Sequence, residues 1–342
     1  MATTIVPEPF IPSSGGNGTR ISSATQNAIL VGIITLLAVF LRLHALTAKT
    51  YWLDEAISVK IARLPWPEFF VALWHREANM AFYYLLLHLW LSLGHTEGFI
   101  RALSVLFSVA TIPVIFALAA RLFNNTTGLL AAFLLAINAF HIRYAQEARG
   151  YALTMFCATL ATWLLVRNLQ EPSTSHWGAY SVVCALTVYS HFYGGLVVVA
   201  HCVALSVLGN TRVPWKSVVR SLLWFSCLMI PIALFIVSTG TGPINWIQPT
   251  GFQALLKLGA DFSGNYGRLL LALVAFAIGM ATLEAARVWS GSRRVVDVWK
   301  YALVLSWLLV PVAIALTASL IKPLFVTRFL SSPSVPTSLR PF

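Results

Sequence analysis

Apolar runs close to 20 residues long recur along the whole chain, and this recurrence limits the fold more than any other feature. A helix of about 20 apolar residues spans the hydrocarbon core of a bilayer. Hydrophobic residues make up 58% of the chain and charged residues only 10%, which excludes a soluble enzyme, a disulfide scaffold and a disordered chain. The sequence therefore predicts an all-α integral membrane protein, a polytopic helix bundle with about 9 to 10 transmembrane segments. The apolar runs lie at about 28–47, 80–95, 101–123, 127–141, 150–169, 177–190, 194–209, 218–238, 267–288 and 300–320.

The apolar runs divide the chain into three parts. Residues 1–26 are rich in Ser, Thr, Gly and Pro and predict a disordered cytoplasmic tail. Residues 27–321 form the transmembrane domain, and residues 322–342 form a basic motif followed by a short Ser- and Pro-rich tail. Within the domain, the long first loop at 48–79 combines several Trp residues with acidic residues, which is typical of short helices lying in the membrane interface.

The positions of Lys and Arg predict the orientation of the chain. The net charge is +12, but the basic residues lie mostly in short loops, so we expect no nucleic-acid partner. Loops 210–220 and 287–300 are the most basic and should be cytoplasmic. Both lie inside only if the region 80–149 crosses the membrane an even number of times, although it has three apolar segments. We expect the shortest of them, 127–141, to be partial or re-entrant.

The chain has only eleven acidic residues, and a charge inside a bilayer is costly, so the positions of the acids are informative. Asp54 and Glu55 follow the first helix, where one of them could be a catalytic base or Asp54 could simply cap a helix. A second cluster places Arg76 and Glu77 before Tyr83, and all three are candidate substrate-binding residues. Here Glu77 could bind substrate or only favour a helix N-terminus.

A third polar cluster lies between two apolar runs. It contains Gln146, Glu147, Arg149 and Tyr151, and its density predicts a polar cavity in which these four residues bind substrate. The alternative is that Glu147 merely pairs with Arg143 four residues earlier on a helix.

Two smaller polar sites accompany these clusters. His191 lies in a tight turn, where a hydrogen-bonded interface residue is the alternative to a functional one. Lys322 and Arg328 follow the last apolar run and could anchor the helix or clamp a phosphate. The orientation places all five groups on one outer face.

Carboxylates and cations beside a hydrophobic phase suit glycosyl transfer from a lipid-phosphate sugar. The leaving phosphate needs positive charge, and a carboxylate on the opposite side can deprotonate the acceptor. Displacement in one step would invert the anomeric centre. A lipid or sugar transporter is the alternative, but it should carry charges near the midplane and two similar halves, whereas here the acids gather at helix ends.

Five motifs in fixed order resemble the bacterial GT-C glycosyltransferases, a group that includes dolichyl-phosphate-mannose protein mannosyltransferase-like proteins and aminoarabinose transferases. The resemblance extends from about residue 28 to 332. The motifs are Trp52-Leu53-Asp54-Glu55, Glu77 followed by Asn79-Met80-Ala81-Phe82-Tyr83-Tyr84, Gln146-Glu147-Ala148-Arg149-Gly150-Tyr151, His191-Phe192-Tyr193-Gly194, and Lys322-Pro323 with Arg328-Phe329-Leu330.

The resemblance implies a multi-pass enzyme of the bacterial inner membrane with its active site on the periplasmic face and a first periplasmic loop that holds interfacial helices. Its donor would be a polyprenyl-phosphate sugar and its acceptor a lipid, glycan or protein. It implies Asp54 as base, Glu77 and Glu147 as acids that orient donor or acceptor, and Arg149, Lys322 and Arg328 as phosphate contacts.

Two departures from the family pattern bear on these expectations. Ala78-Asn79-Met80 stands where relatives often have Lys-Pro or His-Pro-Pro, so the Lys at that point is missing and Arg76 is its substitute. Relatives commonly continue beyond the last motif, so a short or truncated, inactive form is a further alternative. Some GT-C enzymes use a divalent metal and others do not, and the sequence leaves this open.

Overall fold

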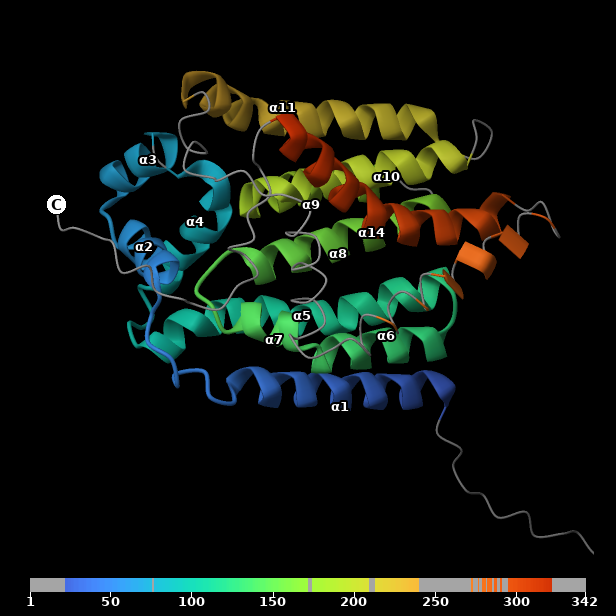
Figure 1. The fold of residues 1–342 in the computed structure, drawn as a ribbon, viewed down its shortest axis with the longest axis horizontal. Helices are drawn as coiled ribbons and strands as arrows, with labels where there is room; N and C mark the ends of the chain where they lie inside the picture. The colour runs from blue at the N-terminus through green and yellow to red at the C-terminus, as the bar shows by residue number, and fades with distance from the viewer. Residues whose placement is uncertain are drawn as a thin grey trace, which may run out of the picture.

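The computed structural model describes residues 22–75, 77–171, 174–208, 213–239 and 295–321, with scattered positions between 272 and 290. Every regular element in these residues is a helix, and the longer helices run side by side in alternating directions (Figure 1). The longer helices are α1 (Ser23–Leu43), α5 (Glu97–Leu122), α6 (Asn125–Ile137), α8 (Tyr151–Gln170), α9 (Thr174–Ser190), α10 (Gly195–Val207), α11 (Trp215–Thr239) and α14 (Val295–Ile321). The expectations for 1–21, 240–266 and 322–342 lie outside the described residues.

Short helices gather at one end of the bundle, which we call the site end (Figure 1). They are α2 (Leu53–Ala62), α3 (Trp66–His75), η1 (Ala78–Met80) and α4 (Ala81–Trp90). The helices expected in the first long loop are therefore present. Helix α3 exposes Trp66, Phe70 and Trp74, a pattern typical of an interfacial helix.

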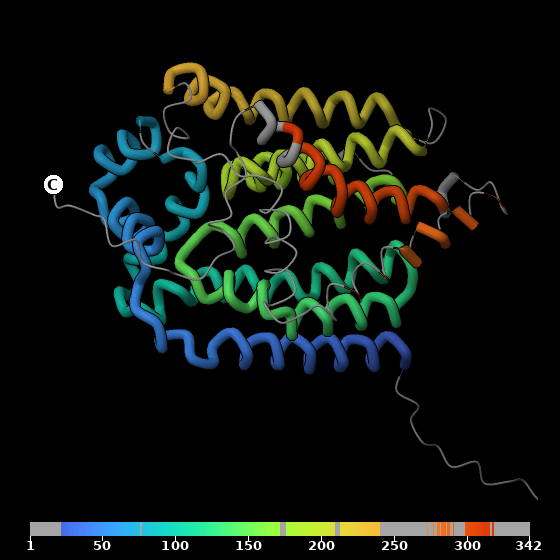
Figure 2. Tube along the Cα trace, viewed as in Figure 1, coloured from blue at the N-terminus to red at the C-terminus, as the bar shows by residue number. Residues whose placement is uncertain are grey.

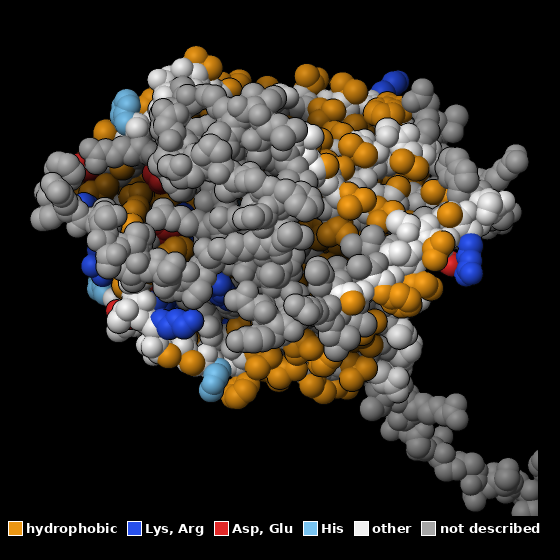
Figure 3. All heavy atoms as spheres, viewed as in Figure 1, with side chains coloured by type: hydrophobic (Ala, Val, Ile, Leu, Met, Phe, Trp, Pro, Cys, Tyr) orange, Lys and Arg blue, Asp and Glu red, His pale blue; other side chains and the backbone are white. Residues whose placement is uncertain are grey.

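The described helices are consistent with an all-α membrane protein. Four of them, α1, α5, α8 and α11, are long and apolar enough to cross a bilayer, and there are five spans if the bent pair α6 and α7 (Ala139–Ala145) counts as one. The expected total of 9 to 10 is not confirmed in the described part. In Figure 3 the visible hydrophobic side chains lie along the length of the bundle, whereas most visible charged side chains lie near its two ends.

Helix α5 lies at the centre of one half of the bundle, where it packs against α1, α6 and α8. Gly128 of α6 allows a close approach, because a Cβ atom there would lie 2.8 Å from the Phe116 carbonyl oxygen of α5. Helix α8 continues the packing to α9, and α9 contacts α11. The large buried cluster between them contains Leu165, Trp177 and Leu205.

The region 80–149 contains one helix long and apolar enough to cross a bilayer, α5, together with the short helix α4 and the bent pair α6–α7. Helix α4 has ten residues, about 15 Å at 1.5 Å per residue, which is half the thickness of the hydrocarbon core. The helix ends before Gly94 and His95, and Thr96 caps the start of α5 by accepting a hydrogen bond from the Phe99 N–H. The α6–α7 pair covers Asn125–Ala145 with a bend of 59°, a geometry that fits either a broken span or the re-entrant segment expected here.

Polar groups close the break between α6 and α7. Asn138 caps α7, since its Oδ1 accepts a hydrogen bond from the His141 N–H at 2.8 Å. Arg42 of α1 is fully buried and donates to the carbonyl oxygens of Ala136 and Leu135, in the last turn of α6. The tube in Figure 2 shows α1 lying beside α6 along this stretch. Carbonyls that a helix end leaves without partners are thus satisfied by another helix.

Candidate active site

Five of the predicted site residues mark the site end, and they come from four separate segments of the chain. Asp54 is in the first turn of α2, Glu77 precedes η1, Glu147 and Arg149 lie between α7 and α8, and His191 precedes η2 (Phe192–Gly194). The Nη1 atom of Arg149 lies 3.4 Å from the Asp54 carbonyl oxygen, and its charge affects Glu77, Glu147 and His191. The predicted convergence of Asp54, Glu77 and Glu147 at one end is therefore present. Arg76, Lys322 and Arg328 lie outside the described residues.

Asp54 presents an available carboxylate. Its backbone is fixed, because its carbonyl oxygen accepts hydrogen bonds from the Ser58 hydroxyl at 2.9 Å and from Arg149. Its side chain is half-buried and makes no hydrogen bond or ion pair with any described residue. A carboxylate with a fixed backbone and free oxygens can accept a proton.

Glu55 differs sharply from its neighbour, because its carboxylate is fully occupied. It is 1% exposed, and Arg101 of α5 donates to it from Nε at 2.9 Å and from Nη2 at 2.8 Å. The N–H groups of Ala148 and Trp52 donate to the same carboxylate. Arg101 also donates to carbonyl oxygens of the loop that joins α1 to α2. A carboxylate with these partners braces α2, α5 and the loop before α8, so the geometry favours Asp54 over Glu55 as the candidate base.

Replacing Glu55 by Gln should lower the free energy of unfolding by about 3 to 5 kcal/mol, because it leaves the Arg101 charge buried and unpaired. Thermal unfolding of the detergent-purified protein measures the effect. The double variant Glu55→Gln/Arg101→Met should recover part of the loss, and Glu68→Gln on exposed α3 is the matched control. A Glu55→Gln variant as stable as the Glu68→Gln control would contradict the brace.

Arg149 is a buried cation without a carboxylate partner among the described residues. It is 8% exposed, and its Nη1 atom lies 3.3 Å from the Ser58 hydroxyl and 3.4 Å from the Tyr84 hydroxyl. Its Nε atom is buried and makes no hydrogen bond. A buried guanidinium is costly unless an anion compensates it. The arrangement suits an anion supplied by a ligand.

The loop that carries Arg149 is held on both sides. Gln146 donates through Nε2 to the carbonyl oxygens of Arg42 and His44, at 3.0 and 2.8 Å, which ties the loop to α1. Its contact with substrate stays a prediction. A Cβ atom on Gly150 would lie 2.7 Å from the Ser190 carbonyl oxygen, which only glycine permits without a shift. The backbone on either side of Arg149 therefore has little freedom.

Glu147 lies in an environment that disfavours its ionised form. Burial raises its pKa to about 7, and the nearby Arg143 opposes the rise. Its Oε1 atom lies 3.6 Å from Arg143 Nε, the pairing that the helical spacing allowed, while its Oε2 atom is buried without a hydrogen bond partner. A carboxyl group of this kind exchanges a proton close to neutral pH.

Stability should fall as pH rises from about 4.5 to about 7, because the folded protein retains the Glu147 proton over this range and the unfolded chain releases it. The effect should approach about 3 kcal/mol at most. Thermal unfolding of wild type and Glu147→Gln across pH 4 to 8 isolates it, since the Gln variant should lack this part of the dependence. Parallel curves for the two proteins would show that Glu147 titrates normally.

Glu77 and His191 complete the polar group at this end. Burial raises the pKa of Glu77, with Arg149 opposing and Asp54 adding to the rise. Burial and then the charge of Arg149 lower the pKa of His191 to about 3, so this imidazole is neutral at physiological pH. Its Nδ1 atom accepts a hydrogen bond from the Tyr193 N–H at 3.2 Å. Asn79 accepts one from the Phe192 N–H at 2.9 Å, which joins the second motif to the fourth.

The tyrosines of the site separate into core and lining. Tyr83, expected to bind substrate, is completely buried and hydrogen-bonds the Ser104 hydroxyl at 3.1 Å, so it belongs to the core. Its neighbour Tyr84, which the sequence reasoning missed, contacts Arg149. The Tyr151 ring lies 5.8 Å from the Arg149 guanidinium and 5.7 Å from the His191 ring, in agreement with its expected place in the site. The described residues contain no group of three or more His, Cys, Asp or Glu that could hold a metal ion.

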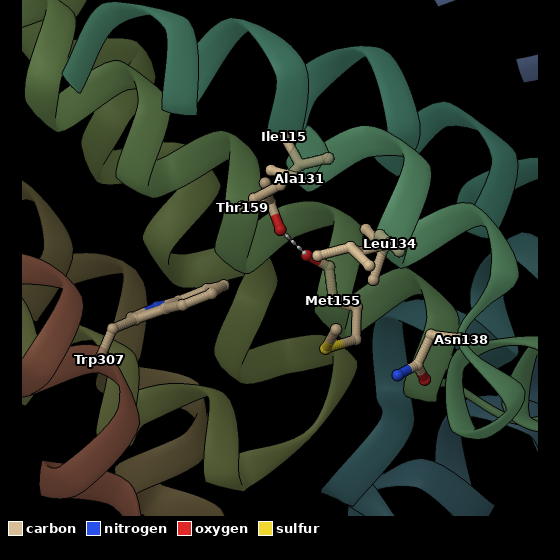
Figure 4. Close-up of a pocket in the computed structure, with 8 residues that line it drawn as sticks. Ile115, Ala131, Leu134, Asn138, Met155, Thr159 and Trp307 are labelled. Carbon is tan, nitrogen blue, oxygen red and sulfur yellow. Dashed lines mark hydrogen bonds between the residues drawn. The ribbon is translucent and has the colours of Figure 1, made fainter. Parts of the chain in front are cut away.

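An apolar pocket of about 260 Å³ lies on the flank of the bundle, between α5, α6, α8 and α14 (Figure 4). Most of its lining residues are apolar. The proton of the Thr159 hydroxyl is not available to a ligand, because the hydroxyl donates to the Met155 carbonyl oxygen inside α8. Asn138, at the break between α6 and α7, forms part of its edge. The remaining lining residues are Ile115, Ala131, Leu134, Leu135 and Trp307.

Residues 78–239, a little under half of the chain, match the family model of dolichyl-phosphate-mannose-protein mannosyltransferases. The match confirms the resemblance to GT-C mannosyltransferase-like proteins and supports a membrane glycosyltransferase of the GT-C type. It includes Glu147, Arg149 and His191, whereas Asp54 lies outside the matched residues. A comparison with curated proteins gave no match.

Proposed function

We propose that this GT-C mannosyltransferase-like protein transfers a sugar from a polyprenyl-phosphate donor to an acceptor hydroxyl or amine at the site end of the bundle. The observation that carries the proposal is Arg149, a buried guanidinium without a described carboxylate partner, beside the helix that presents Asp54. The phosphate of the donor supplies the anion that Arg149 lacks.

Asp54 acts as the general base in the proposed reaction. Its carboxylate takes the proton of the acceptor as the acceptor atom bonds to the anomeric carbon. The bond from that carbon to the phosphate oxygen breaks, and polyprenyl phosphate leaves with the electron pair. Arg149 stabilises the charge that develops on the phosphate. One displacement by one base inverts the anomeric centre.

Glu77 and Glu147 orient the substrates in this proposal. The Glu147 carboxyl group, whose pKa is about 7, can donate a hydrogen bond to a sugar oxygen in its protonated form without repelling the phosphate. His191 stays neutral and supports the rings of Tyr151 and Tyr193. Lys322 and Arg328 remain proposed phosphate contacts, and the apolar pocket beside Trp307 suits part of the isoprenoid chain.

The site end faces the periplasm of a bacterial inner membrane in this proposal. Support comes from Lys216 and Arg220, which lie near the start of α11 at the opposite end of the bundle (Figure 1). Basic residues are enriched on the cytoplasmic side.

Transfer by the purified protein in proteoliposomes tests the function. Polyprenyl-phosphate sugar is added with envelope lipids, glycans or peptides, and both the glycosylated product and free polyprenyl phosphate are measured. We expect the two in equal amounts. Movement of intact donor across the bilayer without release of polyprenyl phosphate would instead identify a flippase. Mass analysis of envelope glycans and lipids from a deletion strain then identifies sugar and acceptor.

A further inference from the structure

A second pocket lies on α2, on a different side from the active site. Its volume is about 410 Å³, and we call it the α2 pocket; it is lined by Tyr51, Ala56, Val59, Lys60, Arg63 and Leu64. The Asp54 carbonyl and the Ser58 hydroxyl lie against Arg149. Because successive helical residues are about 100° apart, Ala56, Lys60 and Arg63 share another face of the same helix. The α2 pocket therefore has no part in the proposed transfer.

Three donors face this pocket without partners in the described part of the chain. Lys60 and Arg63 are exposed, and neither side chain makes a hydrogen bond or ion pair with a described residue. The Tyr51 hydroxyl is buried and makes no hydrogen bond. Burial, assisted by the charge of Glu97, raises the pKa of Tyr51 to about 12, so the hydroxyl keeps its proton.

The charge around the pocket is positive. The Arg101 guanidinium lies 5.1 Å from the centre of the Tyr51 ring, but its donors are already bound to Glu55 and to loop carbonyls. Glu97, at the start of α5, is the other carboxylate that acts on Tyr51, and it forms no ion pair with Lys60 or Arg63. Two unpaired cations and a hydroxyl donor match a phosphate.

Apolar groups adjoin these donors. Val59 and Leu64 form part of the pocket, and on the same helix Leu53 is 64% and Ile57 38% exposed. A short helix with exposed aliphatic side chains in its first half and cations in its second half is typical of a helix that lies in the membrane interface.

We propose that the α2 pocket binds the phosphate headgroup of an anionic phospholipid from the leaflet at the site end. Lys60, Arg63 and the Tyr51 hydroxyl contact the phosphate, and the beginning of the acyl chains lies against Val59 and Leu64. Bound lipid would hold α2 at the bilayer surface. This inference does not rest on the proposed function.

Native mass spectrometry of the full-length protein tests the site. The detergent-purified protein is incubated with phosphatidylglycerol, phosphatidylcholine or inorganic phosphate, and bound molecules are counted. Wild type should retain phosphatidylglycerol in preference to phosphatidylcholine. Lys60→Gln/Arg63→Gln should weaken retention by about 30-fold, since each cation near an anionic lipid contributes about fivefold and the two factors multiply. Tyr51→Phe, which removes only the hydroxyl, should weaken it by about fivefold.

The matched control is Lys216→Gln/Arg220→Gln, which removes two exposed cations at the opposite end of the bundle and should leave this retention unchanged. Melting temperatures of all variants establish that they are folded. Equal retention of phosphatidylglycerol by wild type and Lys60→Gln/Arg63→Gln would overturn the proposal. Displacement of the lipid by millimolar inorganic phosphate would also overturn it, because the pocket would then recognise free phosphate.

Discussion

Replacing Asp54 by Asn should reduce sugar transfer by about 10²- to 10⁴-fold, the usual contribution of a general base. Asn has nearly the same shape but cannot accept the acceptor's proton. The Asp54 carboxylate has no described partner, so the fold should not depend on its charge. The measurement is product formation in proteoliposomes at saturating donor, together with donor affinity. Affinity should change by no more than about twofold, because the loss belongs to the chemical step.

Glu68→Gln is the control for this experiment, since it removes an exposed carboxylate from the neighbouring short helix. Its transfer rate should equal that of wild type. If Asp54→Asn transfers sugar at the wild-type rate, Asp54 is not the base, and Glu77 becomes the next candidate because Glu55 is engaged by Arg101.

Replacing Arg149 by Gln should lower kcat/KM by about 100-fold or more and weaken donor binding, because the guanidinium compensates the donor phosphate. Arg149→Lys should fall between Gln and wild type, since an ammonium keeps the charge but loses the fork of donors. Binding of polyprenyl phosphate and of the matching polyprenol is measured for each protein. Only binding of the phosphate should depend on residue 149.

Arg149 is buried, so melting temperature must be followed beside binding. Arg220→Gln at the opposite end removes an exposed cation and should change neither quantity. A loss of affinity that is equal for polyprenol and polyprenyl phosphate would assign Arg149 to the fold and remove the main support for the proposed donor.

Most of the described helices could be predicted from hydropathy, but the role of the segment 80–95 could not. Apolar composition is continuous through Leu91-Ser92-Leu93, whereas the helix ends at Trp90. Two contacts that follow the end of α4 cannot be predicted from local composition: Gly94 packs against Phe99, and Thr96 caps α5. The charge rule predicts an even number of crossings of this region from loops far outside it, and it does not say which segment is short. Choosing the segment required tertiary contacts.

The acidic residues of the site could be located from their rarity, but their individual roles could not. Asp54 and Glu55 are neighbours in sequence, and only the position of Arg101 in the folded bundle separates them. The sequence does contain a signal for this pairing, since Arg101 lies near the start of the apolar helix α5 and a buried Arg there needs an acidic partner. Tyr83 and Tyr84 illustrate the same limit, because the side of a short helix that meets Arg149 depends on how that helix is tilted.

The cap that Arg42 provides for α6 has a consequence for how the chain enters the membrane. Arg42 precedes Ala136 by 94 residues, so α1 is synthesised long before the break that it closes. The carbonyls exposed at that break would be costly in lipid, yet their donor is already in the bilayer when α6 arrives. The helix that supplies the hydrogen-bond donor is therefore synthesised before the helix that needs it. A chain that lacks α1 would insert α6 with the carbonyls at its end unpaired.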